Sequence, residues 1–175
     1  MRKFSILSYI FAGLMLSSCD GYLKEDPRDQ LYPEDAYDTP QNVYLNTVAS
    51  LYNYIGGYSD SQGLQGTYRG VYDLNTFTTD EAMLPTRGGD WYDGGFWQGL
   101  FLHKWGTNSD AIQATWEYLY KVIVLSNQSL EILGELRQKT DYNDLDRYEA
   151  EVRAFRAMYY YYLVDMFGHV PLIVS

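Results

Sequence analysis

The sequence of 175 residues holds one cysteine, Cys19, and two histidines, His103 and His169. A single cysteine excludes an intrachain disulfide and a metal site built on several thiolates. Neither histidine has the neighbouring cysteines or acids of a zinc site or a catalytic triad. We therefore expect both histidines to be structural.

Positive charge is also scarce. The 13 Lys and Arg residues stand against 23 Asp and Glu residues, which gives a net charge of −10. Binding to a phosphate backbone needs a basic patch, so we expect no nucleic acid partner. Beyond the N-terminal stretch, no apolar run is long enough to cross a bilayer as a helix.

The sequence lacks the convergent pair of carboxylates that hydrolysis of a glycosidic bond requires. Glu149 and Glu151 are two residues apart on a predicted helix and therefore diverge, so we expect ion pairs with Arg153 and Arg156. The acids around Asp90 lack the alternation of a calcium-binding loop. We expect no catalytic residue, no metal and no cofactor, and a glycan-cleaving enzyme stays a third hypothesis that no residue pattern supports.

A positively charged start and an apolar run open the chain. Arg2 and Lys3 precede the thirteen mostly apolar residues 4–16, which suit a secretory signal better than a membrane span. The following Leu-Ser-Ser-Cys19 resembles the lipobox of bacterial lipoproteins, in which the cysteine becomes the lipidated first residue. We predict a signal peptide over residues 1–18 and a membrane anchor at lipidated Cys19. The alternative is an ordinary signal peptide with a chance cysteine.

Residues 19–38 are predicted to be an extended lead-in and tether, because they show no sustained period and contain Pro27 and Pro33. The acids that follow the cysteine, among them Asp20 and Glu25, resemble the surface-export signal of Bacteroidetes-type lipoproteins. A solvated tether explains the same acids. Removal of residues 1–18 leaves 157 residues (175 minus 18), which favours a single domain.

The first predicted helix covers residues 40–55. Thr39 offers an N-cap and Pro40 suits the first helical position. Apolar side chains then recur at helical spacing, and two glycines follow residue 55. The stripe consists of Tyr44, Val48, Leu51 and Ile55.

Two longer helices are predicted over residues 110–136 and 148–167, joined by the polar loop 139–144. A short connection between long helices indicates an antiparallel hairpin. The four tyrosines 159–162 must point in every direction around the last helix, so we expect that helix to be packed on most sides. The predicted fold class is all-α, with tetratricopeptide-like helix pairs and long glycine- and aromatic-rich loops.

Glycine is dense over residues 56–108, where we predict one helical turn at residues 71–76 and otherwise loop. A loop of this length in a compact domain is usually functional or disordered. Its tryptophans and phenylalanines argue against disorder. Within it, Asp80-Glu81 is interpreted as a helix N-cap, with a hydroxyl acceptor or cation ligand as the alternative.

The segment 87–97 is the candidate glycan platform. A flat aromatic ring covers the apolar face of a sugar, while charged side chains bond its hydroxyls and glycines let the backbone turn sharply. In the alternative reading, the tryptophans plug the loop onto the helices and the two charged residues pair with each other. The candidate ligand-binding residues are Arg87, Asp90, Trp91, Tyr92 and Trp97.

Several motifs together resemble the N-terminal part of the SusD/RagB family of outer-membrane lipoproteins. They are the lipobox, Phe-Thr-Thr-Asp80-Glu81, Trp91-Tyr-Asp-Gly-Gly95, the helix from Trp116 to Asn127, and the block 149–172. The resemblance implies a helical, tetratricopeptide-like protein on the outer face of the outer membrane. It also implies glycan or nutrient binding, a role as lid on a SusC-like TonB-dependent transporter, and no enzyme activity.

The chain ends in an apolar run after Pro171, so we expect a truncated chain, with residues 39–175 forming an incomplete SusD-like helical domain. The alternative function is a helical adaptor that binds only the transporter protein, in which case the aromatic loop seals that interface and does not contact sugar.

Overall fold

The computed structural model describes residues 35–56, 63–64, 70–90 and 92–174. The predicted signal peptide 1–18, Cys19, most of the lead-in and Trp91 lie outside the described residues. The chain divides into two units, Met1–Ala36 and Tyr37–Ser175. All elements from α2 (Pro40–Tyr44) onward lie in the second unit.

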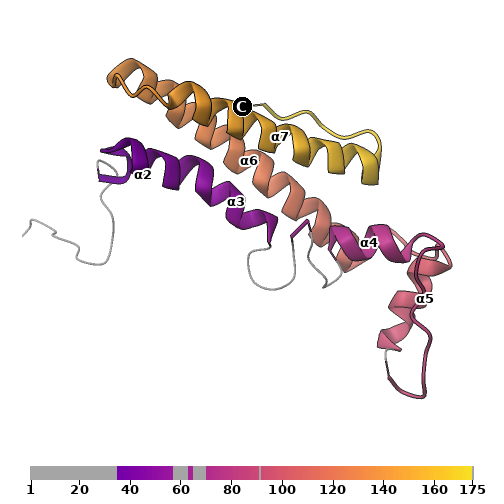
Figure 1. Cartoon of the computed structure of the whole chain (residues 1–175). Coiled ribbons are helices and arrows are strands. Elements are labelled where there is room, and N and C mark those ends of the chain that lie inside the picture. The colour runs from indigo at the N-terminus through magenta and orange to yellow at the C-terminus, as the bar shows by residue number, and fades with distance from the viewer. Residues whose placement is uncertain (1–34, 57–62, 65–69, 91, 175) are drawn as a thin grey trace, which may run out of the picture. The chain divides into compact units, whose positions relative to one another are not determined.

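The described residues form helices and no β-strand, which confirms the all-α class (Figure 1). The tetratricopeptide-like pairing stays a prediction. None of the described helices has the length and apolar character needed to cross a membrane. The elements in chain order are η1 (Asp35–Tyr37), α2 (Pro40–Tyr44), η2 (Leu45–Ala49), α3 (Ser50–Ile55), α4 (Val71–Phe77), η3 (Asp93–Gly95), α5 (Phe96–Phe101), α6 (Asp110–Lys139) and α7 (Leu145–Phe167).

The antiparallel pair α6 and α7 forms the main body, as the short loop predicted (Figure 1). Leu119 and Ile123 of α6 are fully buried against Val152 and Leu163 of α7. Burial of each such side chain stabilises the fold by about 1.5–3 kcal/mol. The larger core cluster therefore lies along the seam of the hairpin and includes the N-terminal helix.

The helix predicted over residues 40–55 is present but has one wide turn. Thr39 caps it, and its hydroxyl accepts a hydrogen bond from the Asn42 backbone N–H at 3.2 Å. The π-helical turn η2 separates α2 from α3. In this turn the carbonyl of Thr47 accepts a hydrogen bond from Ser129 Oγ of α6 at 2.9 Å. The wide turn thus ties the N-terminal helix to the hairpin.

The expectation that the last helix is packed on most sides is wrong. Tyr159 is fully buried, but Tyr161 is 65% exposed and Val164 is also exposed. One face of α7 therefore packs on the core and another faces solvent. The tyrosine run divides between the two faces, since Tyr160 and Tyr162 are half-buried.

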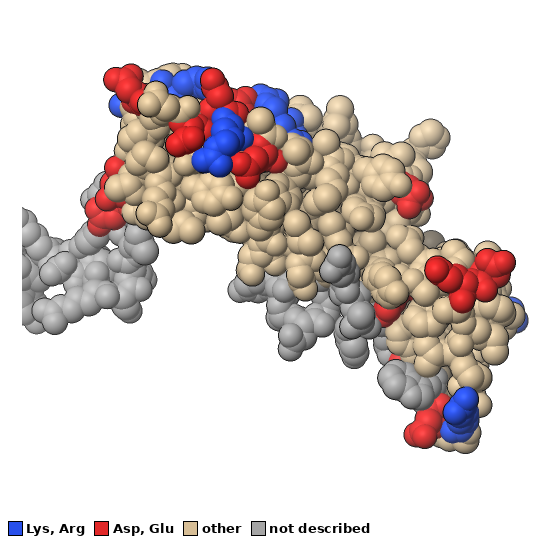
Figure 2. Space-filling view, viewed as in Figure 1, with Lys and Arg blue, Asp and Glu red and all other residues tan. Residues whose placement is uncertain are grey.

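Charged side chains gather where α6 ends and α7 begins (Figure 2). Glu149 forms the predicted ion pair with Arg153 at 2.6 Å, and a second with Arg137 at 2.6 Å. The hydrogen bonds from Arg153 lower the pKa of Glu149. The prediction for Glu151 is wrong, because its carboxylate lies 3.5 Å from Arg147 on the same side of the helix, one turn back.

Arg156, the partner predicted for Glu151, instead donates a hydrogen bond to Asn127 Oδ1 of α6 at 2.7 Å. After α7 the chain turns at Gly168, whose φ is +73°, and runs back along the hairpin (Figure 1). Tyr160 Oη accepts from the Ile173 N–H at 2.6 Å and donates to the Ile173 carbonyl at 2.8 Å. Side chains of the hairpin thus satisfy the backbone of this extended segment.

A second, smaller cluster of buried side chains joins α4, α5 and the start of α6. It consists of Leu74, Trp97, Leu100 and Ala111. The helical turn predicted at residues 71–76 is present as α4. The prediction of loop for the rest of this region is wrong at α5, which is helical.

Candidate functional site

The loop between α4 and α5 holds the predicted platform. Arg87 and Asp90 form an isolated antiparallel bridge, in which the Asp90 N–H donates to the Arg87 carbonyl at 3.1 Å. Gly88 takes a φ of +64° in the turn between them, a conformation that favours glycine. Both side chains are exposed. Within the described ranges the two charged groups form no ion pair, so their pairing is between backbones only.

A run of left-handed residues follows and fixes the start of α5. Asp93, Gly94 and Gly95 have φ values of 44°, 64° and 81°. The Gly95 N–H donates to the Tyr92 carbonyl at 2.6 Å. This tight turn brings the chain from the surface loop directly into α5, in which Trp97 and Leu100 are buried.

Tyr92 lies on the surface of this turn. Its side chain is 53% exposed. Its ring lies against the turn itself, because a Cβ at Gly95 would come 3.9 Å from Tyr92 Cε2 and Oη. Tyr92 therefore presents a flat ring to solvent, and the ring rests against the turn at Gly95. Trp91, the neighbouring predicted residue, lies outside the described residues.

Trp97 lies in a different environment, since only 7% of the residue is exposed. Its ring packs edge-to-face on Phe77 and Phe96, with centroid distances of 4.9 and 5.0 Å. The indole fastens α5 to α4, as the alternative reading of this tryptophan expected. A buried ring offers no face to a sugar, so Trp97 and Tyr92 are not brought together on one accessible surface.

Trp105 is an aromatic side chain that was not among the predicted site residues. It is 46% exposed. It lines a hollow of about 320 Å³ beside α5 and a pocket of about 270 Å³ that reaches α4 and α7. Its position between Lys104 and Gly106 repeats the charge, aromatic and glycine signal of segment 87–97. That signal was available in the sequence.

His103 supports the turn that presents Trp105. Its φ is +53°, and its Nε2 lies 2.7 Å from the Thr78 carbonyl, which only accepts, so Nε2 carries the hydrogen. The Lys104 N–H donates to the Gly99 carbonyl at 2.7 Å and closes the end of α5. The histidine therefore links this turn to the end of α4.

The interpretation of Asp80-Glu81 as a helix N-cap is wrong. The residues that follow, 82–86, are not helical, and the Glu81 N–H donates to Thr79 Oγ1 at 3.2 Å. The Thr79 hydroxyl thus satisfies this N–H group, and it donates its own hydrogen to the Thr76 carbonyl at 2.8 Å. Across the described ranges, no three His, Cys, Asp or Glu side chains gather closely enough to hold a metal ion.

Comparison of the sequence with known proteins identifies the family to which the chain belongs. Residues 35–175 match a SusD-like family whose description reads "starch-binding associating with outer membrane". A SusD-like protein of Formosa agariphila is 26% identical over 175 aligned positions, and the alignment covers 98% of this chain and 31% of that protein. The chain thus spans about a third of the length of this relative. No solved structure matches the chain. Since the family match covers most of the chain, the chain belongs to the SusD-like family of proteins associated with the outer membrane.

Proposed function

We propose that this protein is a cell-surface lipoprotein that captures oligosaccharide and delivers it to a TonB-dependent outer-membrane transporter of the SusC-like kind. Membership of a family described as starch-binding supports the ligand class. The observation that carries the proposal to particular residues is the exposed ring of Tyr92, held on a glycine turn. Arg87 and Asp90 lie close to it in sequence, and both of their side chains are exposed.

The proposed site works by stacking and directional hydrogen bonds. The ring of Tyr92, with Trp91 beside it in sequence, covers the apolar C–H face of a sugar. The guanidinium of Arg87 donates to sugar hydroxyls and the carboxylate of Asp90 accepts from them. Trp97 does not contact the sugar but positions the loop, because its ring is buried against α4. No bond is made or broken, so the protein acts as a binding protein and not as an enzyme.

The proposed location follows from the start of the chain. Lipidated Cys19 anchors the protein in the outer membrane, facing the cell exterior, and the acidic lead-in acts as a tether. The transporter then receives the oligosaccharide from a protein that is confined to the same surface. Confinement raises the local concentration of captured ligand without any new contact.

Calorimetric titration against a glycan panel tests this proposal. Maltoheptaose, laminarihexaose, cellohexaose and xylohexaose serve as probes. We expect Trp91→Ala and Tyr92→Ala each to lower the affinity for the oligosaccharide about five- to ten-fold, because each removes one stacking face. Tyr72→Ala is the matched control, since Tyr72 of α4 is also 53% exposed and lies outside the platform. Unchanged binding in both platform variants would remove the loop from the proposed site.

A helical adaptor that binds only the transporter protein is the second candidate. The observation that favours it is the solvent-facing side of α7, where Tyr161 and Val164 expose apolar surface. Exposed apolar surface often marks a protein interface. Co-purification with a transporter barrel, together with no affinity for any glycan of the panel, would support this candidate over the first.

A further inference from the structure

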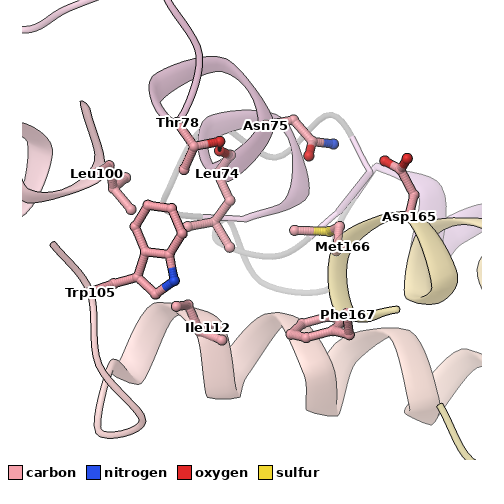
Figure 3. Close-up of a pocket in the computed structure, with 9 residues that line it drawn as sticks. All are labelled: Leu74, Asn75, Thr78, Leu100, Trp105, Ile112, Asp165, Met166 and Phe167. Atoms are coloured by element: carbon pink, nitrogen blue, oxygen red, sulfur yellow. Dashed lines mark hydrogen bonds between the residues drawn. The ribbon is translucent and has the colours of Figure 1, made fainter. Parts of the chain in front are cut away.

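A pocket of about 270 Å³ lies between α4, the start of α6 and the end of α7, apart from the platform loop. Figure 3 shows its walls: Leu74, Leu100 and Ile112 lie near the ring of Trp105, and Phe167 lies on the α7 side. The pocket is therefore mostly apolar and has a large aromatic ring at one end. Because Trp105 is nearly half exposed, the ring is open to a ligand.

The opposite end of this pocket is polar. Asn75 of α4 and Asp165 of α7 lie there (Figure 3). Both residues are exposed, and within the described part of the chain neither side chain forms a hydrogen bond. Thr78 adds a hydroxyl, although its hydrogen is donated to the Leu74 carbonyl at 2.6 Å. The pocket thus joins an aromatic face to one carboxylate and one amide that are available to a ligand.

We infer that this pocket is a second sugar subsite, which holds one neutral pyranose unit and disfavours acidic sugars. The inference rests on the proposed function and names the class of sugar. Its volume lies just below the range of drug-sized pockets, which suits one ring and not an oligosaccharide. The pyranose stacks its C–H face on the Trp105 ring, and the sugar hydroxyls form hydrogen bonds with Asn75 and Asp165.

The charge of the pocket gives the selectivity. An ionised carboxylate only accepts hydrogen bonds, so Asp165 suits a hydroxyl donor and repels the carboxylate of a uronic acid. Among the described residues that line the pocket there is no Lys or Arg to offset it. The chain as a whole carries a charge of −10, which opposes an anionic ligand further.

Nuclear magnetic resonance of the four tryptophan indole N–H groups in the full chain tests the inference. The probes are methyl glycosides of glucose, galactose, mannose and xylose, and of glucuronate and galacturonate. We expect at least one neutral glycoside to shift the Trp105 signal saturably, with the signal assigned by Trp105→Phe. We expect the uronates to leave it in place.

Variants of the polar end sharpen the test. We expect Asp165→Asn to lower the affinity for the neutral glycoside about ten-fold and to reduce the discrimination against uronates, because it removes a charged acceptor. Asp141→Asn is the matched control, since it removes an exposed carboxylate far from the pocket in the chain, between α6 and α7. Circular dichroism confirms that the variants fold.

The outcomes separate this inference from the proposed function. If oligosaccharides bind through Tyr92 while no neutral glycoside moves the Trp105 signal, the second subsite is overturned and the proposed function stands. The subsite is equally overturned if Asp165→Asn changes nothing or if uronates bind as well as neutral sugars. If no sugar of either size binds, the proposed function fails together with the subsite.

Discussion

The phenolic oxygens of Tyr118 and Tyr159 lie 2.8 Å apart in the core between α6 and α7. Tyr118 uses its own hydrogen to bond the Tyr54 carbonyl at the end of α3. Tyr159 is therefore the donor of the pair, and the three residues form one chain of hydrogen bonds. This chain ties the N-terminal helix to both helices of the hairpin. Burial raises the pKa of Tyr118 to about 12 and also raises the pKa of Tyr159.

These raised pKa values predict a loss of stability in alkali. A tyrosine in the unfolded chain ionises near pH 10, whereas the buried pair keeps its protons in the folded state to higher pH. The stabilisation is therefore complete below pH 10 and declines as the pH rises toward 12. Urea unfolding at several pH values between 8 and 11.5 measures this decline. The double variant Tyr118→Phe and Tyr159→Phe should show a shallower decline, and an equal one would contradict the assignment.

The two tyrosines should differ in their cost on replacement by phenylalanine. Tyr159→Phe removes one hydrogen bond and leaves Tyr118 bonded to Tyr54, so we expect a loss of about 1 kcal/mol in the free energy of unfolding. Tyr118→Phe leaves both the Tyr159 hydroxyl and the Tyr54 carbonyl without this partner, so we expect about 1–3 kcal/mol. Equilibrium unfolding in urea gives both values. A larger loss of unfolding free energy for Tyr159→Phe would contradict the inferred direction of the hydrogen bonds, from Tyr159 to Tyr118 to Tyr54.

Gly95 and Gly99 provide a matched pair at the start and in the middle of α5. Gly95→Ala should destabilise by about 1–2 kcal/mol, because φ is +81° there. Gly99→Ala should stabilise by about 0.5–1 kcal/mol, since its Cβ would lie at an ordinary 3.5 Å from the Lys104 carbonyl oxygen. Thermal unfolding measures both changes. Gly95→Ala should also weaken oligosaccharide binding, because the turn holds Tyr92; equal effects of the two substitutions on binding would count against that role.

Tyr160→Phe should release the extended segment that follows α7. The variant removes the acceptor of the Ile173 N–H, so we expect that amide to exchange its hydrogen about five-fold faster. Hydrogen exchange followed by nuclear magnetic resonance measures the rate. Tyr161→Phe is the control, because the Tyr161 side chain faces solvent. Unchanged protection of Ile173 in Tyr160→Phe would show that other contacts hold the segment.

The long helices were predictable because their buried residues recur at a helical period over many turns. Val152, Tyr159 and Leu163 of α7 are such positions, and all three are fully buried. The helix α5 was not predictable on the same grounds, since it has six residues and an internal glycine, Gly99. Its stability comes from Trp97 and Leu100, which pack on α4. That packing joins residues far apart in sequence and leaves no local period.

The candidate site shows the same limit. The composition of segment 87–97 indicated an aromatic loop, but composition does not say which ring is buried. The backbone decides this, because the left-handed residues before Phe96 turn α5 inward and carry Trp97 with it. Asn75 and Asp165 were not predictable as neighbours, since 90 residues separate them (165 minus 75) and only the packing of α4 near α7 brings both to one pocket.

The wide turn η2 has a consequence for how this helix tolerates insertions and deletions. A π-helical turn accommodates one more residue than an α-helical turn. Loss of one residue from Leu45–Ala49 would therefore restore regular winding and leave the faces of α2 and α3 in register with the hairpin. Loss of one residue from the middle of α6 would rotate everything beyond it by about 100°. Homologues are thus expected to vary in length by one residue at η2 and to keep constant length through α6.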